Sequence, residues 1–156
     1  MITIELLKNR LDSLPRLCEI WHTELGSTWA PDTPIEDIIE RFKTHLNDDQ
    51  IPLTYVAFDN NIPIGMCSLR EKDGTLRQDL SPCLGSLVVD KQYQGKGIGK
   101  MLMEKVINKA KSMNYKTLYL FAIGEGKYKY YENSGWESVC DDEFKNIPVK
   151  VMKMDL

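Results

Sequence analysis

The chain has 156 residues, 42% of them hydrophobic, and its 20 Lys and Arg against 23 Asp and Glu give a formal net charge of -3. This length and composition predict one domain, residues 1–156, with a single packed core. The charges of both signs are mixed along the chain, without the basic excess typical of nucleic-acid binders, so we expect no nucleic-acid partner. The same balance is compatible with a small cationic substrate.

Cysteine and histidine are scattered along the chain. The cysteines are Cys18, Cys67, Cys83 and Cys140, with no Cys-x-x-Cys pair, and the two histidines lie far apart. This pattern indicates neither a zinc site nor a disulfide framework. No window approaches the roughly 20 apolar residues of a membrane span, and the N-terminus has no signal-like apolar run. We therefore expect a cytoplasmic protein with no bound metal and no membrane partner.

The N-terminal third is predicted to hold an edge strand and two helices. Residues 1–7 can form the strand, and residues 12–26 have the apolar spacing of a helix. Ser13 is expected to cap this helix, with Pro15 in its first turn and Gly26 at its end.

A turn-rich loop, residues 26–32, is expected before the second helix. Thr33 and Glu36 have the spacing of a capping box, and Pro34 suits the first helical position. The apolar residues that follow at helical spacing are Ile35, Ile38, Ile39, Phe42 and Leu46.

The middle of the chain alternates between strand and loop patterns. Residues 53–69 read as two antiparallel strands around the turn at 59–61, where Asp and Asn tolerate a positive φ. Residues 70–82, which are charged and contain Gly74 and Pro82, predict a mobile or functional loop before a strand at 83–89.

The C-terminal half predicts a mixed sheet. A helix from about Gly97 to Met113 is followed by a buried-type strand at 116–123, and this order implies a parallel strand pair joined by a crossover. The remaining elements are a short helix in 127–135 that stops at Gly135, a strand at 136–140 and a last strand at 148–156.

Three glycines, Gly95, Gly97 and Gly99, stand between the strand at 83–89 and the long helix. Each would weaken a helix or strand interior by about 0.5 to 1 kcal/mol, so another role is expected for them. A bare turn at a helix N-terminus directs unpaired N–H groups and the positive end of the helix dipole at one spot. The pattern indicates an anion cradle, to which Lys91, Lys96 or Lys100 could add charge.

Two common phosphate-binding motifs do not fit this turn. The ATP-binding loop needs Ser or Thr after its Gly-Lys pair, whereas Met101 follows Lys100, and Gln94 stands where the earlier glycine would be. The dinucleotide fingerprint needs Gly-x-Gly-x-x-Gly, whereas this turn reads Gly-x-Gly-x-Gly, without an acidic partner about 20 residues later.

The arrangement Gln94-x-x-Gly97-x-Gly99 after a strand resembles the acetyl-CoA motif of the GNAT superfamily of N-acetyltransferases. The stretch "YYENSGW", residues 130–136, is similar to a second signature of that family near its C-terminus. The resemblance covers roughly residues 52–156. It implies an α/β fold with a mixed, mostly antiparallel sheet flanked by helices, and a V-shaped cleft between the two parallel central strands.

The resemblance also implies where acetyl-CoA, as cosubstrate, would bind. A bulge near residues 87–89 would splay the strand, so that the backbone at Leu87 and Val89 pairs with the pantetheine arm. The pyrophosphate would be held by N–H groups of residues 94–100. The implied cofactor-binding residues are Leu87, Val88, Val89, Gln94, Gly95, Lys96, Gly97, Ile98, Gly99 and Lys100.

The same resemblance assigns part of the chemistry. Tyr131 matches the signature tyrosine that typically lies near the CoA sulfur, and a phenol with a reference pKa of about 10 stays protonated and can act as general acid. The alternative is a core aromatic beside Tyr128 and Tyr130. The oxyanion donor would be the N–H of Val88 or Val89.

The general base and the acceptor pocket are less clearly indicated. Acidic candidates for the base are Glu24, Glu71, Asp73 and Asp79, with solvated surface positions or a water relay as the alternatives. The fold usually builds its acceptor pocket where this chain has Trp21, His22, Glu24 and Trp29, which could equally be core residues. Arg77, Asp79 and Ser81 are expected to fix the loop before the cofactor strand, or simply to form a surface turn.

Two departures from the family pattern stand out. Gly124 and Lys127 occupy positions where many members carry asparagine and alanine, so the contact ascribed to that asparagine is in doubt here. Trp136 replaces the usual phenylalanine, which is a conservative aromatic change.

These patterns predict an enzyme that transfers acetyl directly from acetyl-CoA to a primary amine, since no cysteine is paired with a histidine for an acyl-enzyme route. Acceptors left open are a polyamine, an aminoglycoside-like amine, an amino-acid derivative and a peptide N-terminus. The alternatives are a non-catalytic acyl-CoA sensor and a protein-interaction module. The family often forms dimers, and the alternation in residues 149–156 would suit a pairing edge strand.

Overall fold

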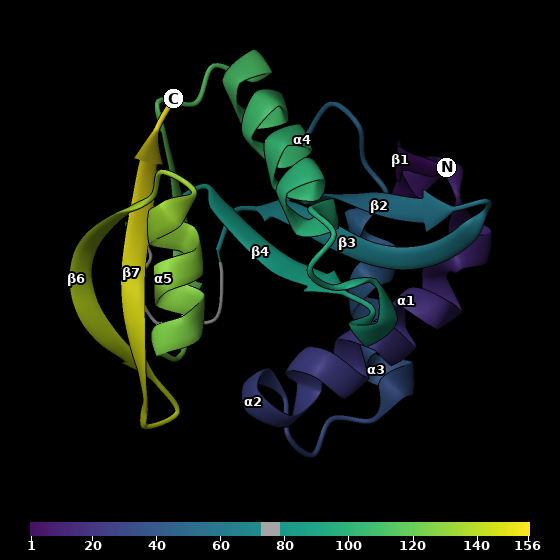
Figure 1. The fold of residues 1–156 in the computed structure, drawn as a ribbon, viewed down its shortest axis with the longest axis horizontal. Helices are drawn as coiled ribbons and strands as arrows, with labels where there is room; N and C mark the ends of the chain where they lie inside the picture. The colour runs from purple at the N-terminus through teal and green to yellow at the C-terminus, as the bar shows by residue number, and fades with distance from the viewer. Residues whose placement is uncertain (73–78) are drawn as a thin grey trace.

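The structure is a computed structural model that describes residues 1–72 and 79–156; the predicted loop at 70–82, including Asp73, Gly74 and Arg77, falls partly outside these residues. Within them, seven strands form one sheet with helices on both faces (Figure 1). The strands are β1 (Ile2–Leu6), β2 (Leu53–Asp59), β3 (Ile62–Arg70), β4 (Cys83–Val89), β5 (Thr117–Ala122), β6 (Glu137–Phe144) and β7 (Ile147–Asp155). The helices are α1 (Leu14–Trp21), α2 (Ser27–Trp29), α3 (Ile35–Phe42), α4 (Ile98–Ser112) and α5 (Glu125–Asn133).

The sheet confirms the predicted mixed topology. Its strand order is β1-β2-β3-β4-β5-β7-β6, and every neighbouring pair is antiparallel except β4 and β5. These two strands are joined through α4, which supplies the crossover that a parallel pair requires. The sheet is therefore mostly antiparallel, with its parallel pair in the middle.

The parallel strands β4 and β5 separate almost as soon as they meet. Their register contains one pair, Cys83 with Tyr119, and the Tyr119 N–H donates to the carbonyl of Pro82 (3.0 Å). Beyond this pair, residues 84–87 of β4 and residues 120–122 of β5, with Ile123 just after it, line opposite sides of a cavity. This is the predicted V-shaped opening.

A bulge in β4 bends the strand away from β5. Met66 of β3 pairs with Val88, but Ser68 pairs with Gly85, so β4 has one residue more than β3 between these pairs. Ser86 has a φ of +51°, the left-handed region that a residue in a regular strand avoids. The bulge therefore lies just before the predicted stretch at 87–89.

Two apolar layers hold the helices against the sheet. On one face, α4 contributes Leu102, Val106 and Ala110, and Trp136 joins the same cluster. On the other face, α1 and α3 pack against β2, β3 and β4 through a cluster that includes Leu17 and Phe42. Figure 1 shows α4 in front of the central strands and α1 and α3 behind them.

The first helical region is longer than the sequence predicts. Gly26 does not end it, because a π-helical turn at 22–26 leads directly into α2. The expected loop at 26–32 is thus helical as far as Trp29. Ser13 is itself helical and makes no side-chain cap; its hydroxyl donates to the carbonyl of Arg10 (2.6 Å), while Pro15 does lie in the first turn.

The predicted capping box of the second helix does not form. Pro34, not Thr33, is the N-cap of α3, and no side chain caps this end. Leu46 lies beyond the helix and forms an isolated bridge with Leu53. The proline fixes an extended entry into the helix, which starts the helix one residue later than the box requires.

The hairpins and C-terminal elements follow the predicted order, with bounds shifted by one to four residues. Asn60 and Asn61 adopt φ of +49° and +72° in the β2–β3 turn, as predicted. Strand β6 extends to Phe144 and turns into β7 at Lys145 and Asn146, which also have positive φ. Among the described residues, no helix is both long and apolar enough to cross a membrane.

Candidate active site

The glycine turn has the backbone geometry of a binding cradle. Gly95 and Gly97 have φ of +78° and +82°, and a Cβ built on either would meet no heavy atom within 4 Å. Gly97 is the N-cap of α4, and the first turn of that helix contains no acidic residue. Since the first N–H groups of a helix have no partner within it, the turn presents donors and the positive dipole end to an open space.

Gln94 makes hydrogen bonds within the protein at both its backbone and its side chain. Its backbone N–H donates to the carbonyl of Lys91 (3.4 Å), and its side-chain amide donates to the carbonyl of Val89 (2.9 Å). The residue thus ties the turn to the end of β4. The N–H groups that can meet an anion are those after it.

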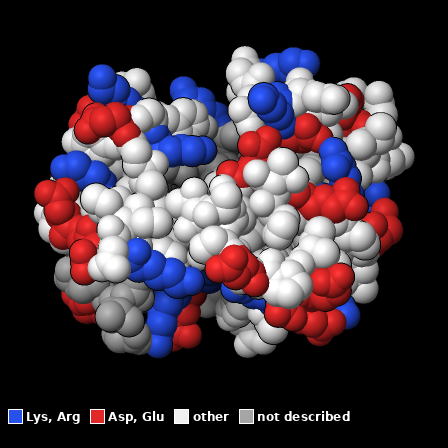
Figure 2. Space-filling model, turned by 90° about the horizontal axis from the view of Figure 1, so that it is seen from below, with Lys and Arg blue, Asp and Glu red and all other residues white. Residues whose placement is uncertain are grey.

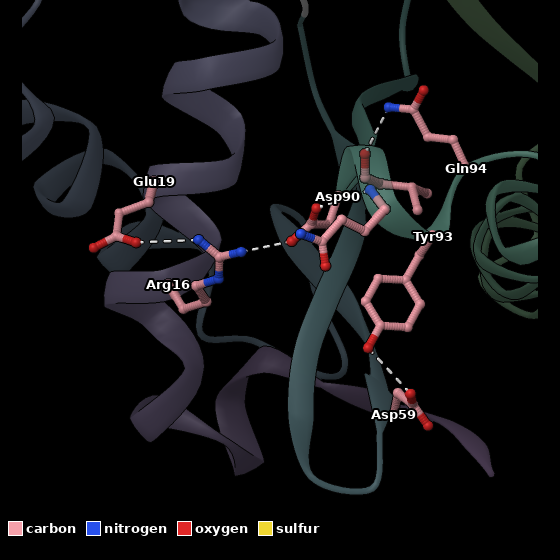
Figure 3. A network of polar contacts seen from close by, with 8 residues as sticks. Arg16, Glu19, Asp59, Asp90, Tyr93 and Gln94 are labelled. Carbon is pink, nitrogen blue, oxygen red and sulfur yellow. Dashed lines mark hydrogen bonds and ion pairs between the residues drawn. The ribbon is translucent and has the colours of Figure 1, made fainter.

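A network of polar contacts fixes the turn between β4 and α4 (Figure 3). Asp90 accepts from the N–H of Gln92 and pairs with Arg16 of α1. Tyr93 donates its hydroxyl to Asp59 at the end of β2 (3.1 Å). The turn is held from a helix on one side and a strand on the other, so the cradle is formed before any ligand arrives.

A groove of about 510 Å³ runs from the cradle along β4. Its lining includes Leu87, Val88, Val89, Gln94, Gly95, Gly97, Ile98, Gly99 and Lys100. Lys96 is absent from this lining, and its ammonium lies 5.4 Å from the centre of the Tyr93 ring. The implied cofactor residues are therefore gathered along one groove, except for Lys96.

The end of β4 offers one outward N–H. The N–H of Asp90 donates to the carbonyl of Ile64 on β3 (2.7 Å). Because N–H groups alternate along a strand, that of Val88 also faces β3 and that of Val89 faces the open edge. Of the two predicted oxyanion donors, only Val89 therefore directs its N–H away from β3.

A second cavity of about 570 Å³ lies between the splayed strands and the N-terminal helices. Trp21, Glu24 and Trp29 line it, as predicted for the acceptor pocket. His22 does not line it, because its Nε2 lies 3.2 Å from the carbonyl of Thr33 on the helix exterior.

The two cavities meet at residues that line both. These shared residues are Glu24, Leu25, Leu87 and Lys127. Glu24 lies in the π-helical turn, a kind of distortion often found at functional sites. Of the other candidate bases, Glu71 and Asp79 are exposed and line neither cavity, and Asp73 lies outside the described residues.

The two adjacent tyrosines of α5 face different cavities. Tyr131 is 8% exposed and lines the second cavity, whereas Tyr130 lines the cofactor groove. Their rings lie 5.3 Å apart, nearly perpendicular. A Cβ at Gly99 would come within 2.9 Å of the Tyr130 hydroxyl, so Gly99 leaves room for that phenol. Burial raises the pKa of Tyr130, so its phenol stays protonated.

Several residues of these cavities gave no signal in the sequence. They are Arg41, Arg70 and Lys145, which come from α3, β3 and the β6–β7 turn. Their spacing in the chain carries no motif, because the fold alone brings them together. In the part of the chain that the structure describes, no cluster of three or more His, Cys, Asp or Glu could hold a metal ion.

Comparison with known proteins identifies the family. A profile of the Acetyltransferase (GNAT) family matches residues 14–136. The chain belongs to this family. The comparison with curated proteins gave no match.

Solved structures share this GNAT fold over the whole chain. The Salmonella typhimurium protein YncA, solved with its cofactor acetyl-CoA, aligns with a TM-score of 0.73 at 12% identity, over 99% of this chain and 93% of that one. A chain of the NatC complex bound to Gag peptide and CoA gives 0.75 at 20% identity, over 99% and 98%. An acetyltransferase from Streptococcus agalactiae gives 0.74 at 18% identity, over 99% and 98%.

Proposed function

We propose that this GNAT protein is an acetyl-CoA-dependent N-acetyltransferase that moves acetyl directly to a primary amine. The observation that carries the proposal is the meeting of the glycine-lined groove and the second cavity at Leu87, on the splayed strand β4. A thioester lying along β4 from the cradle would reach this point, and an amine could approach it from the opposite side. The family and the acetyl-CoA in a structural neighbour support the choice of cosubstrate.

In this proposal the chain binds acetyl-CoA mainly through its backbone. The N–H groups from Gly95 to Lys100 would take the pyrophosphate at the positive end of α4. The open edge of β4 at Leu87 and Val89 would pair with the amide groups of the pantetheine arm, as an added strand does. The second cavity is then left for the acceptor.

The transfer itself needs three groups, and the site offers one for each. The Val89 N–H would donate to the carbonyl oxygen as it becomes an oxyanion. Glu24, where the cavities meet, would take a proton from the acceptor ammonium. The amine nitrogen then forms the new C–N bond, the C–S bond breaks, and Tyr131 would give its phenolic proton to the departing thiolate. The second proton that the amine nitrogen loses as it becomes an amide would return to the Tyr131 phenolate.

The test measures thiol release from acetyl-CoA with a panel of amines, alongside calorimetric titration with acetyl-CoA, CoA and ATP. We expect micromolar acetyl-CoA binding, no ATP binding and amine-dependent thiol release. Binding without release for any amine would favour a non-catalytic sensor. Absence of binding to either CoA species would overturn the enzyme and leave an interaction module.

The Glu24 assignment has its own matched pair. Glu24→Gln should lower kcat/KM for the acceptor by about tenfold or more and weaken its rise with pH, because the proton acceptor is lost. Glu71→Gln removes an exposed carboxylate that lines neither cavity and should change neither quantity. Equal effects of the two variants would exclude Glu24 as the base.

A further inference from the structure

We infer that the second cavity accepts a small amine that also carries an oxyanionic group, with a carboxylate as the first candidate and a phosphate as the second. This inference rests on the proposed function and names the acceptor class. It replaces the cationic acceptor that the net charge of the chain allowed.

The lining of the cavity has the opposite charge balance to the chain. Arg41, Arg70, Lys127 and Lys145 line it, and Glu24 is the one acidic residue in its described lining. The chain as a whole has a net charge of -3. On the face shown in Figure 2, Lys and Arg are interspersed with Asp and Glu, so that face is not a continuous basic surface. The positive charge gathers at the cavity although the molecule is acidic.

The acidic side chain and the two arginines lie in different parts of the cavity. Glu24 lies where the cavity meets the cofactor groove, whereas Arg41 and Arg70 line the cavity alone. An acceptor whose ammonium pairs with Glu24 therefore places its other end among the arginines. A guanidinium offers a planar fork of donors that matches a carboxylate or phosphate. Such an orientation sets the amine toward the thioester and the anion away from it.

A buried donor adds to the two arginines. Trp21 lines the same cavity and is 3% exposed, and its indole Nε1 is buried without a hydrogen-bond partner among the described residues. A buried N–H without a hydrogen-bond partner destabilises the folded state, so an oxyanion that accepts from it in the cavity would be bound more tightly. The Arg41 guanidinium lies 5.8 Å from the Trp21 ring, which places this donor beside one of the arginines.

The strand bulge positions the other arginine. Arg70, at the end of β3, donates from Nη2 to the hydroxyl of Ser86 (2.8 Å), the bulge residue of β4. Buried His45 has a lowered pKa, caused first by its burial and then by the charges of Arg70 and Arg41. Two guanidiniums and one indole N–H, from β3, α3 and α1, thus form the proposed oxyanion site.

The experiment compares matched acceptors in the thiol-release assay. Each standard amino acid is tested beside its amide and its decarboxylated amine, and phosphoethanolamine is tested beside ethanolamine. We expect at least one amino acid to exceed both its amide and its decarboxylated amine by about tenfold or more in kcat/KM, since charge-assisted hydrogen bonds are lost with the anion. Preference for the amides, for diamines or for ethanolamine would overturn the inference while leaving the N-acetyltransferase intact.

Variants locate the anion in the cavity. Arg70→Gln should raise KM for the anionic acceptor by roughly 10- to 100-fold, with Arg70→Lys intermediate and KM for acetyl-CoA unchanged. Trp21→Phe keeps a ring but removes the N–H and should raise the same KM several-fold. Lys129→Gln, an exposed charge change on α5 outside both cavities, is the control. An Arg70→Gln effect on acetyl-CoA alone would overturn the inference, because the arginine would then serve the cofactor.

Failure of the proposed function and failure of this inference give different results in the two assays. Absence of acetyl-CoA binding in the titration would overturn the enzyme and the inference together. Acetyl-CoA binding with thiol release only from amines that lack an anionic group would overturn the inference alone.

Discussion

The two halves of the site are built in different ways. The proposed cofactor half consists mainly of backbone, from one continuous stretch between β4 and α4 in which Gly95 and Gly97 adopt left-handed φ. The acceptor half consists of side chains from α1, α3, β3, α5 and the β6–β7 turn. A backbone site leaves a spaced motif in the sequence, whereas a side-chain site assembled by the fold leaves none.

The comparison explains why the two halves can vary separately. Phosphate and amide groups of a shared cosubstrate need N–H donors and room, which glycine provides in any member of the family. The acceptor is recognised by charge and shape, which scattered side chains can change one at a time. The following experiments ask how far this separation holds.

The largest effect is expected in the cofactor half. Gly97→Glu places a side chain and a negative charge at a φ of +82°, at the positive end of α4. We expect acetyl-CoA affinity to fall by more than about 100-fold in calorimetric titration. Gly126→Glu makes the same change at an open position of α5 that lines neither cavity, and it should bind normally. Unchanged binding by the Gly97 variant would refute the cradle.

The next effect concerns the proton donor proposed in the second cavity, Tyr131. Tyr131→Phe should lower kcat by about tenfold or more and leave acetyl-CoA affinity nearly unchanged, because only a proton donor is lost. Tyr130→Phe, its neighbour in the cofactor groove, is the matched control and should retain most of the turnover. The reverse order in single-turnover measurements would assign the proton to Tyr130 instead.

A smaller effect concerns stability beneath the acceptor half. His45 is 3% exposed, and its Nδ1 lies 2.9 Å from the hydroxyl of Thr54. Burial, with Arg70 and Arg41 nearby, lowers its pKa to about 3. In the unfolded chain this imidazole takes up a proton near pH 6.5, whereas in the folded protein it stays neutral until about pH 3. The neutral His45 therefore favours the folded state fully above pH 6.5, and this contribution is lost as the pH falls toward 3.

The measurement for His45 is urea unfolding between pH 7 and 4. This residue contributes a slope of at most about 1.4 kcal/mol per pH unit in the wild-type protein. His45→Gln keeps a polar side chain without the titration and should show a flatter dependence. Parallel pH profiles for the two proteins would contradict the assignment.

The smallest effect is expected from the network behind the cradle. Arg16→Ala removes the partner of Asp90, a pair in which the arginine is 47% exposed, and should weaken acetyl-CoA binding only a few-fold. Lys43→Ala removes a comparable surface ion pair, with Glu40, far from the groove and should leave binding unchanged. A loss as large as that of the Gly97 variant would mean that the side chain, not the backbone, dominates the cofactor half.

Sequence reasoning reached the cofactor half more fully than the rest. The order of the strands and helices along the chain and the parallel pair follow from local patterns, and glycine spacing likewise indicates the proposed cradle, because these signals act over a few residues. The continuation of the first helix past Gly26 could not be read this way. It depends on tertiary contacts, such as Trp29 against Phe144 at 5.0 Å, between residues far apart in the chain.

The acceptor half shows the same limit more strongly. Arg41 and Arg70 are ordinary helix and strand-end residues in the sequence, and only the sheet brings them to one cavity. In the sequence, Glu24 is one of four acidic candidates for the base that nothing distinguishes. In the structure it lies in the π-helical turn, where the two cavities meet. Side-chain convergence across elements is a property of the fold, so no local pattern could indicate it.

The single register pair between β4 and β5 divides the sheet into two groups of strands that pair with each other at one position only. One group contains β1 to β4 and the other contains β5 to β7, and Cys83 and Tyr119 form the pair that connects them. A pantetheine arm paired along β4 would lie between β4 and β5, in the place that a further strand would take. Binding of the cosubstrate would then connect the two groups of strands and reduce local opening of the sheet. Amide hydrogen exchange should become slower in both groups when acetyl-CoA is bound.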